Sequence, residues 1–137
     1  MAGNMYHITV TTQARYPFFK DPLAACTAAR TFESCTALRD AHMLAWVLMP
    51  DHVHWLLQLG EGCPLQMVVR RLKSISAVKV NHQLERSGPV WARAYHDHAL
   101  RDDEDLLSVA RYIVSNPLRA RLTNNLGNYP FWNAIWL

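Results

Sequence analysis

The sequence predicts an α+β fold of the ferredoxin-like type, in which a split β-α-β repeat forms a four-stranded antiparallel sheet. The expected elements follow the order β-α-β-β-α-β-α, so two helices cover one face of the sheet and an extra C-terminal helix is left over. One strand is apolar on both alternating sets of side chains, as in the centre of a covered sheet. The 137 residues, half of them hydrophobic, are enough for one domain over residues 1–137 with its own core.

The first half of the chain accounts for one β-α-β unit. Residues 6–12 alternate tyrosine, isoleucine and valine with histidine and threonine, which is the period of a half-buried strand. A helix over residues 22–38 begins at Asp21-Pro22, because proline is favoured in the first turn of a helix. Residues 43–49 are apolar on both sets and predict the central strand.

The second half of the chain predicts the other repeat and the extra helix. Residues 52–59 alternate again, residues 65–86 have the pattern of a long amphipathic helix, and residues 93–100 predict a short strand. Acidic residues begin a further helix over residues 104–116, which ends before a proline because proline restricts the residue that precedes it. We expect the aromatic tail from Gly127 onward to dock on the body.

The positive charge of the chain is concentrated in one segment. The net charge is only +3, with 14 basic and 11 acidic residues. The helix predicted over residues 65–86 holds five basic residues and one acidic residue, a net +4, so the rest of the chain sums to −1. This distribution indicates a local basic surface that faces something anionic, although an ordinary solvated helix face fits the same pattern.

Cysteine usage and hydropathy indicate a cytoplasmic protein. The three cysteines are odd in number and include no Cys-x-x-Cys pair, which argues against a disulfide framework and favours a reducing compartment. The N-terminal residues do not follow the pattern of a signal peptide. The longest apolar run, residues 43–50, is far shorter than the ~20 residues that span a bilayer, so we expect no membrane association.

Two His-x-His triplets are the first candidates for chemistry. On a strand, His52 and His54 point to one side while Val53 turns to the apolar side, so two imidazoles could converge on one divalent ion. Two strand histidines without a ligand remain the alternative. For His96 and His98 a purely structural interpretation is favoured, because the acidic residue between them marks no core face.

Tyr112 is the second candidate. It lies outside the apolar stripe of its predicted helix, and Asn116 is four residues further on, so both side chains are expected on one helical face. A tyrosine beside an amide ligand could be a nucleophile toward a metal-bound phosphate. Its phenol has an ordinary pKa of ~10 and would need activation by an ion or a base. The alternative is an interfacial tyrosine followed by an asparagine that ends the helix.

Taken together, these segments resemble those of a known family. Residues 49–56, Met-Pro-Asp-His-Val-His-Trp-Leu, resemble the metal-binding strand of the HUH (His-hydrophobic-His) single-strand nucleases. Residues 110–120 resemble the nucleophile helix of their single-tyrosine transposases, and residues 72–74 and 90–98 also fit. The chain is most similar to the REP-associated tyrosine transposase (RAYT) family over nearly its whole length, including the tail Asn-Tyr-Pro-Phe-Trp.

The resemblance implies a function and a set of site residues. It implies a Mg²⁺ or Mn²⁺ site built from His52 and His54, with Asn116 as third ligand where relatives often carry glutamine. It also implies that Tyr112 attacks DNA, forms a 5′-phosphotyrosine and releases a 3′-OH, as an endonuclease and strand transferase. The implied substrate is single-stranded or hairpin DNA from repetitive extragenic palindromes, and a monomer and a homodimer both remain open.

The basic segment would then hold the DNA. The candidate DNA-binding residues are Arg70, Arg71, Lys73, Ser74, Trp91 and Arg93, with the tryptophan stacking on a base. Two other functions stay open. One is a ferredoxin-like module that binds nucleic acid without chemistry, and the other is a structural zinc domain that uses both His-x-His pairs.

Overall fold

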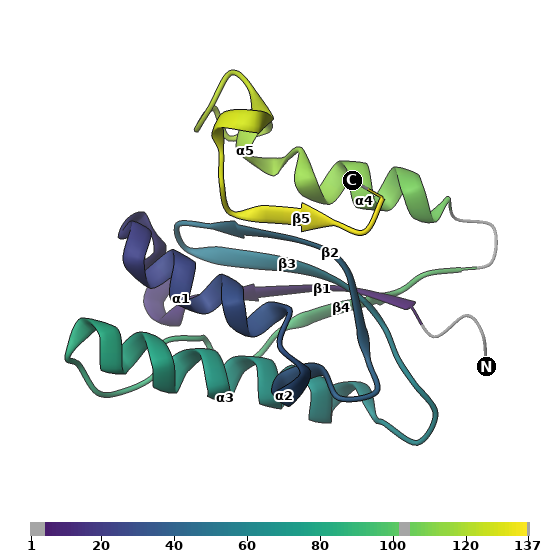
Figure 1. Ribbon diagram of the computed structural model, residues 1–137, viewed down its shortest axis with the longest axis horizontal. Helices are drawn as coiled ribbons and strands as arrows, with labels where there is room; N and C mark the ends of the chain where they lie inside the picture. The colour runs from purple at the N-terminus through teal and green to yellow at the C-terminus, as the bar shows by residue number, and fades with distance from the viewer. Residues whose placement is uncertain (1–4, 102–104, 137) are drawn as a thin grey trace.

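The computed structural model describes residues 5–101 and 105–136 and contains one antiparallel sheet (Figure 1). Its strand order is β4-β1-β3-β2-β5. The strands are β1 (Met5–Thr11), β2 (His42–Met49), β3 (His52–Gln58), β4 (His96–Ala99) and β5 (Trp132–Ala134). The central pair, β1 and β3, comes from the two different repeats, so the predicted split β-α-β fold is confirmed. The short β5 adds a fifth strand beside β2 that the sequence pattern does not predict.

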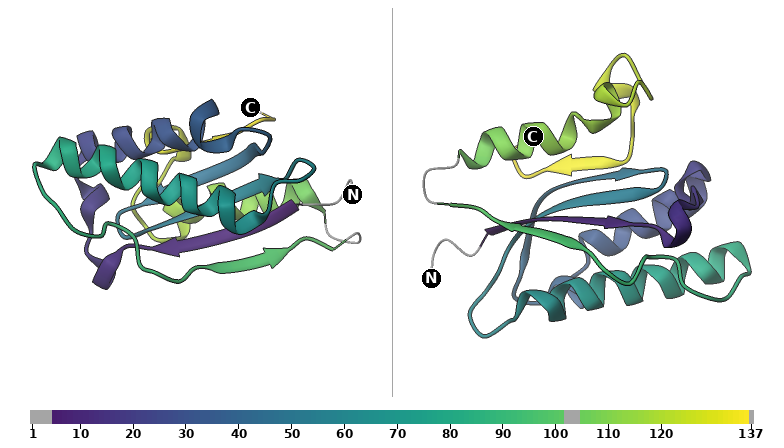
Figure 2. Two further views of the ribbon diagram at one scale, coloured as in Figure 1. Left: turned by 90° about the horizontal axis from the view of Figure 1, so that it is seen from below. Right: turned by 180° about the vertical axis from the view of Figure 1, so that it is seen from behind.

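Helices lie on both faces of this sheet (Figures 1 and 2). On one face, α1 (Pro22–Phe32) and α2 (Cys35–Leu38) pack against α3 (Leu65–Leu84). On the other face lie α4 (Leu106–Val114) and the single-turn α5 (Asn116–Arg119), with α4 against β2, β3 and β5. Short 3₁₀ turns occupy Gln13–Arg15, Phe18–Lys20 and Leu126–Asn128. In the described part of the chain, no helix is long and apolar enough to cross a membrane.

The helix predicted over residues 22–38 is two helices. Its start is as expected, because the Asp21 carboxylate accepts hydrogen bonds from the backbone N–H groups of Leu23 and Ala24. The break comes at Ser34, whose hydroxyl donates to the carbonyl of Thr31 and accepts from the N–H of Ala37. A serine that bonds to nearby backbone in this way competes with the helical pattern and starts a new turn.

The sheet has a hydrophobic core on each face, and the alternation of side chains along β3 determines which residues pack into each core. Val53, Trp55 and Leu57 are fully buried against the layer of α1 and α3. Leu56 points the other way, into a second core under α4 that includes Ile113. From Leu44 onward the side chains of β2 are buried on both faces, as expected, although β2 lies between β3 and β5 rather than in the central pair.

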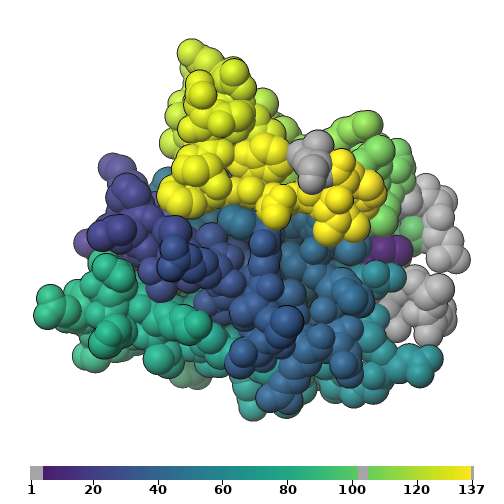
Figure 3. All heavy atoms as spheres, viewed as in Figure 1, coloured from purple at the N-terminus to yellow at the C-terminus, as the bar shows by residue number. Residues whose placement is uncertain are grey.

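The aromatic tail docks on the body as expected (Figure 3). The Tyr129 hydroxyl donates a 2.6 Å hydrogen bond to the carbonyl of Leu48, and the Leu48 N–H donates to the carbonyl of Phe131 at 2.9 Å. These contacts bring the chain back to the edge of the sheet, where β5 pairs with β2.

Two C-terminal boundaries differ from the prediction. The expected strand over residues 93–100 is shorter and covers His96–Ala99. The expected helix over residues 104–116 begins at Leu106 and ends at Val114, because the Ser115 backbone leaves the helical conformation before Pro117. Residues 102–104, which contain most of the acidic residues expected at this helix start, lie outside the described residues.

Candidate functional site

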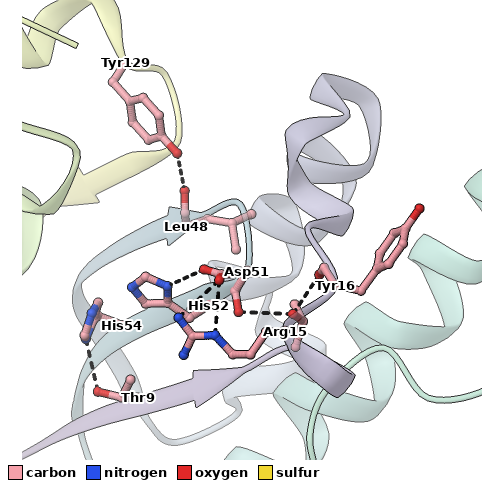
Figure 4. Close-up of polar contacts among 9 residues, drawn as sticks. Thr9, Arg15, Tyr16, Leu48, Asp51, His52, His54 and Tyr129 are labelled. Carbon is pink, nitrogen blue, oxygen red and sulfur yellow. Dashed lines mark hydrogen bonds and ion pairs between the residues drawn. The ribbon is translucent and has the colours of Figure 1, made fainter. Parts of the chain in front are cut away.

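His52 begins β3 and is held by a carboxylate (Figure 4). Its Nδ1 donates to Asp51 Oδ1 at 2.9 Å, and Asp51 Oδ2 forms an ion pair with the Arg15 guanidinium at 3.1 Å. Partial burial by itself would raise the pKa of the Asp51 carboxyl. The hydrogen bond from His52 and the charge of Arg15 outweigh this effect and hold the pKa below its ordinary value. The ionised carboxylate therefore accepts the proton on His52 Nδ1 and leaves the lone pair on Nε2.

His54 lies next to His52 on the same face of the sheet. The two ring centroids are 5.1 Å apart, with the planes nearly perpendicular at 87°. Nδ1 of His54 lies 3.1 Å from Thr9 Oγ1 and 3.0 Å from His7 Nε2, both on the neighbouring strand β1. Burial, together with the charges of His52, His7 and Arg119, lowers the pKa of His54 to about 3. His54 is therefore neutral at physiological pH, which is the form that binds metal ions.

The two imidazoles offer a pair of nitrogens for one cation. Within the described residues, Nε2 of His52 and Nε2 of His54 have no hydrogen-bond partner. The described residues contain no group of three histidine, cysteine or acidic side chains that could hold a metal ion. A divalent ion at this pair would therefore take its remaining ligands from amide, water or phosphate oxygens, which suit Mg²⁺ and Mn²⁺. The donor set fits such an ion.

Tyr112 and Asn116 are not on one continuous helix, in contrast to the prediction. Tyr112 is on α4 with 57% of its surface exposed, whereas Asn116 is the first residue of α5. The Asn116 amide donates to the carbonyl of Ile113 at 3.2 Å, so its Nδ2 is used locally and its Oδ1 remains for other contacts. The described contacts do not join Asn116 to His52 or His54.

Arg119 is a site residue that the sequence analysis missed. Its guanidinium lies 3.9 Å from the centroid of the Tyr112 ring and also donates to the Ser115 hydroxyl. Its charge is one of the causes of the lowered pKa of His54. The Arg119 guanidinium thus contacts the Tyr112 ring, and its charge also affects His54 on β3. It follows the break at Ser115, so no helical periodicity places it beside Tyr112.

Five of the six predicted DNA-binding residues line one groove. This groove has a volume of about 510 Å³ and runs between α3 and the segment that leads into β4. It brings together Arg70, Lys73, Ser74, Trp91 and Arg93. Lys73 is partly engaged, since its ammonium donates to the carbonyls of Ala92 at 2.8 Å and Arg93 at 3.0 Å, and burial lowers its pKa.

Arg71, which does not line the groove, and Trp91, which does, both make structural contacts. Arg71 is directed to α2, where it donates to the carbonyl of Ala37 at 2.8 Å. Trp91 belongs to the core, because it is 5% exposed and its Nε1–H donates to Ser76 Oγ at 2.9 Å. The expectation that Trp91 stacks on a base is therefore corrected, since its ring packs against Phe19 and Trp55.

Comparison with curated proteins agrees with the resemblance seen in the sequence. Two proteins from Haemophilus influenzae are each 28% identical to this chain. One is named as a REP-associated tyrosine transposase, and the match extends over 98 residues, which are 64% of this chain and 56% of that protein. The other is named as an uncharacterized protein and matches over 97 residues, which are 53% of this chain and 52% of its own length. The chain spans about half the length of these relatives.

Solved structures of transposases share the fold. A REP-associated tyrosine transposase bound to a REP hairpin has a TM-score of 0.72 at 22% identity, covering 96% of this chain and 77% of that chain. A transposase from Deinococcus radiodurans has a TM-score of 0.61 at 19% identity, covering 90% of this chain and 88% of its own.

A family model described as IS200-like transposase matches residues 2–116. The match extends from the first strand to Asn116 and so includes the histidine pair and Tyr112. This chain therefore belongs to the IS200-like transposase family.

Proposed function

We propose that this chain cuts and rejoins single-stranded or hairpin DNA with Tyr112 as nucleophile, at a divalent-metal site that contains His52 and His54. The observation that carries the proposal is the histidine pair. Each Nδ1 is engaged by a neighbouring side chain, while both Nε2 atoms are free of hydrogen bonds within the described residues. Ligating histidines in metalloproteins are held in this way.

His52 and His54 would hold Mg²⁺ or Mn²⁺, with the Asn116 amide oxygen as a further candidate ligand. When bound, such an ion polarises a phosphate oxygen and neutralises charge that develops in the transition state. Both histidines must be neutral to act as ligands, and the buried His54 meets this condition throughout the physiological range.

Tyr112 would carry the covalent step. Its oxygen forms a new bond to phosphorus while the bond from phosphorus to the 3′ oxygen breaks. The phenol loses its proton, and the departing 3′ oxygen gains one to become a 3′-OH. One phosphodiester replaces another, so the 5′-phosphotyrosine keeps the energy needed for rejoining. The Arg119 guanidinium beside the Tyr112 ring supplies a positive charge where the phosphate would arrive.

The groove beside α3 would bind the DNA backbone. Arg70 and Arg93 bring two guanidinium groups to this groove. The groove is on the α3 side of the sheet, whereas the histidines point to the opposite side, because they alternate with the buried Val53. A DNA segment that touches both would therefore pass around an edge of the sheet.

A labelled hairpin oligonucleotide on a denaturing gel tests the proposal. With Mn²⁺ or Mg²⁺, the wild type should give a cleaved product and a covalent protein–DNA adduct. Tyr112→Phe should bind the hairpin but give neither product, and His52→Ala should not cleave. Tyr16→Phe is a matched control, because Tyr16 is also exposed, at 60%, and does not line the groove beside α3. An adduct formed by Tyr112→Phe would contradict the assigned nucleophile.

A nucleic-acid-binding module without chemistry is the second candidate. The observation in its favour is that, within the described residues, no hydrogen bond or ring contact joins the exposed Tyr112 to His52 or His54. Hairpin binding that needs no divalent ion, together with the absence of any adduct on cleavable substrates, would favour this alternative.

A further inference from the structure

The Nδ1 atom of His54 meets two side chains from β1, of which Figure 4 labels Thr9. Thr9 lies directly opposite His54 in the antiparallel register, and Thr9 Oγ1 is 3.1 Å from Nδ1. His7 is the next residue on the same face of β1, and its Nε2 is 3.0 Å from the same atom. The two imidazole rings have centroids 5.1 Å apart and planes inclined at 44°.

We propose that Thr9 and His7 are positioning residues for the metal centre, which together keep the proton of His54 on Nδ1 and so present its Nε2 to a divalent ion. This inference rests on the function proposed above and adds two residues to it. Neither residue would touch the metal or the DNA; each would act through His54.

The chemistry of imidazole requires such partners. A nitrogen that binds a metal ion carries no hydrogen, so the other nitrogen must carry it and donate it. The Thr9 hydroxyl has lone pairs and can accept from His54 Nδ1 in any protonation state of its neighbours. His7 Nε2 can accept only when the His7 ring is neutral.

The two candidate ligands are thus held by different chemistry. His52 donates to the charged carboxylate of Asp51, which Arg15 keeps ionised. His54 lies instead against a hydroxyl and a second imidazole, neither of which is a carboxylate. Neutral acceptors avoid an additional buried charge beside His54, which would be costly without a close partner.

Titration of the metal-free protein with Mn²⁺, with the signal of free Mn²⁺ followed by electron paramagnetic resonance, tests the inference without DNA. The variants are Thr9→Val, which removes the acceptor at nearly constant shape, Thr9→Ser, which keeps the hydroxyl, and the double variant His7→Leu/Thr9→Val. His82→Leu removes an exposed histidine on α3 and serves as the matched control. Thermal unfolding without metal checks that each variant is folded.

The double variant should weaken Mn²⁺ binding about 10- to 100-fold, in the range seen when outer-shell partners of ligating histidines are removed. Thr9→Val should weaken binding less, while Thr9→Ser and His82→Leu should match the wild type. If the double variant does not fold, the Mn²⁺ affinities of Thr9→Val and Thr9→Ser test the role of Thr9. Equal Mn²⁺ affinity of these two variants would overturn that role.

The failure of this inference differs from the failure of the metal site. Wild-type Mn²⁺ affinity in the folded double variant, combined with loss of binding in His52→Ala, would overturn the role of Thr9 and His7 and leave the metal centre intact. A wild type that binds no Mn²⁺ under any of these conditions would overturn the metal centre and this inference with it.

Discussion

Replacement of His54 by glutamine should make the metal-free protein less sensitive to acid. The unfolded imidazole has a pKa of 6.5, whereas burial and neighbouring charges lower that of the folded state to about 3. Above the unfolded value His54 is neutral in both states, and its full contribution to stability is present. As the pH falls below that value, the unfolded state binds a proton that the folded state excludes, so stability is lost until about pH 3.

The expected magnitude follows from these two values. A pH of about 5 is about 1.5 units below the pKa of the unfolded imidazole, and each unit corresponds to about 1.36 kcal/mol of stability. His54 alone should therefore lower the free energy of unfolding by about 2 kcal/mol between about pH 8 and about pH 5. The pKa of His7 is also lowered, so it contributes in the same direction and the whole protein should lose more.

Urea unfolding at the two pH values, in the presence of a chelator, measures this loss. The free energy of unfolding of the wild type minus that of His54→Gln should be about 2 kcal/mol smaller at about pH 5 than at about pH 8. His82→Gln, at an exposed position of α3, is the matched control. A loss of stability in His54→Gln as large as in the wild type would refute the reasoning, because it would mean that folded His54 takes up a proton as readily as the unfolded chain.

Three further predictions concern the tail, the core and the groove. Tyr129→Phe removes a buried hydrogen bond and should destabilise the protein by about 1 kcal/mol in thermal unfolding, and an unchanged melting temperature would contradict this. Trp91→Phe removes the hydrogen bond that Trp91 donates to Ser76, whose hydroxyl keeps its bond to the Leu72 carbonyl, and should cost about 1 kcal/mol. The hairpin affinity of the folded variant should stay the same; the reverse pattern would restore a stacking role. In salt titrations of hairpin binding, Arg70→Ala should reduce the salt slope by about one, whereas Arg71→Ala should lower stability and leave the slope unchanged.

Local patterns predict the elements well because backbone geometry alone sets their periods. The period of two in residues 52–58 places Val53 and Trp55 on one side and the histidines on the other, and the structure has that arrangement. The ends of helices are predicted less well where a side chain competes with the backbone for hydrogen bonds. Ser34 divides one predicted helix, and Ser115 ends another before Asn116.

The candidate site could be predicted only in part. The sequence pattern identifies His52, His54 and Tyr112 as candidates, because each lies outside the apolar face of its strand or helix. It does not indicate their neighbours. Arg119 meets Tyr112 from α5, beyond the end of the predicted helix, and Trp91 is buried against Phe19, Trp55 and Ser76.

The sequence by itself determined the ferredoxin-like order of elements and the face on which the histidines lie, since both follow from contacts and periods within short segments. Only the tertiary structure decided what those histidines meet. The register of β1 against β3 brings Thr9 and His7 to His54, and the turn at Gln13–Arg15 brings Arg15 to Asp51. These contacts join residues far apart in the chain, so they depend on packing of the whole sheet rather than on any local preference.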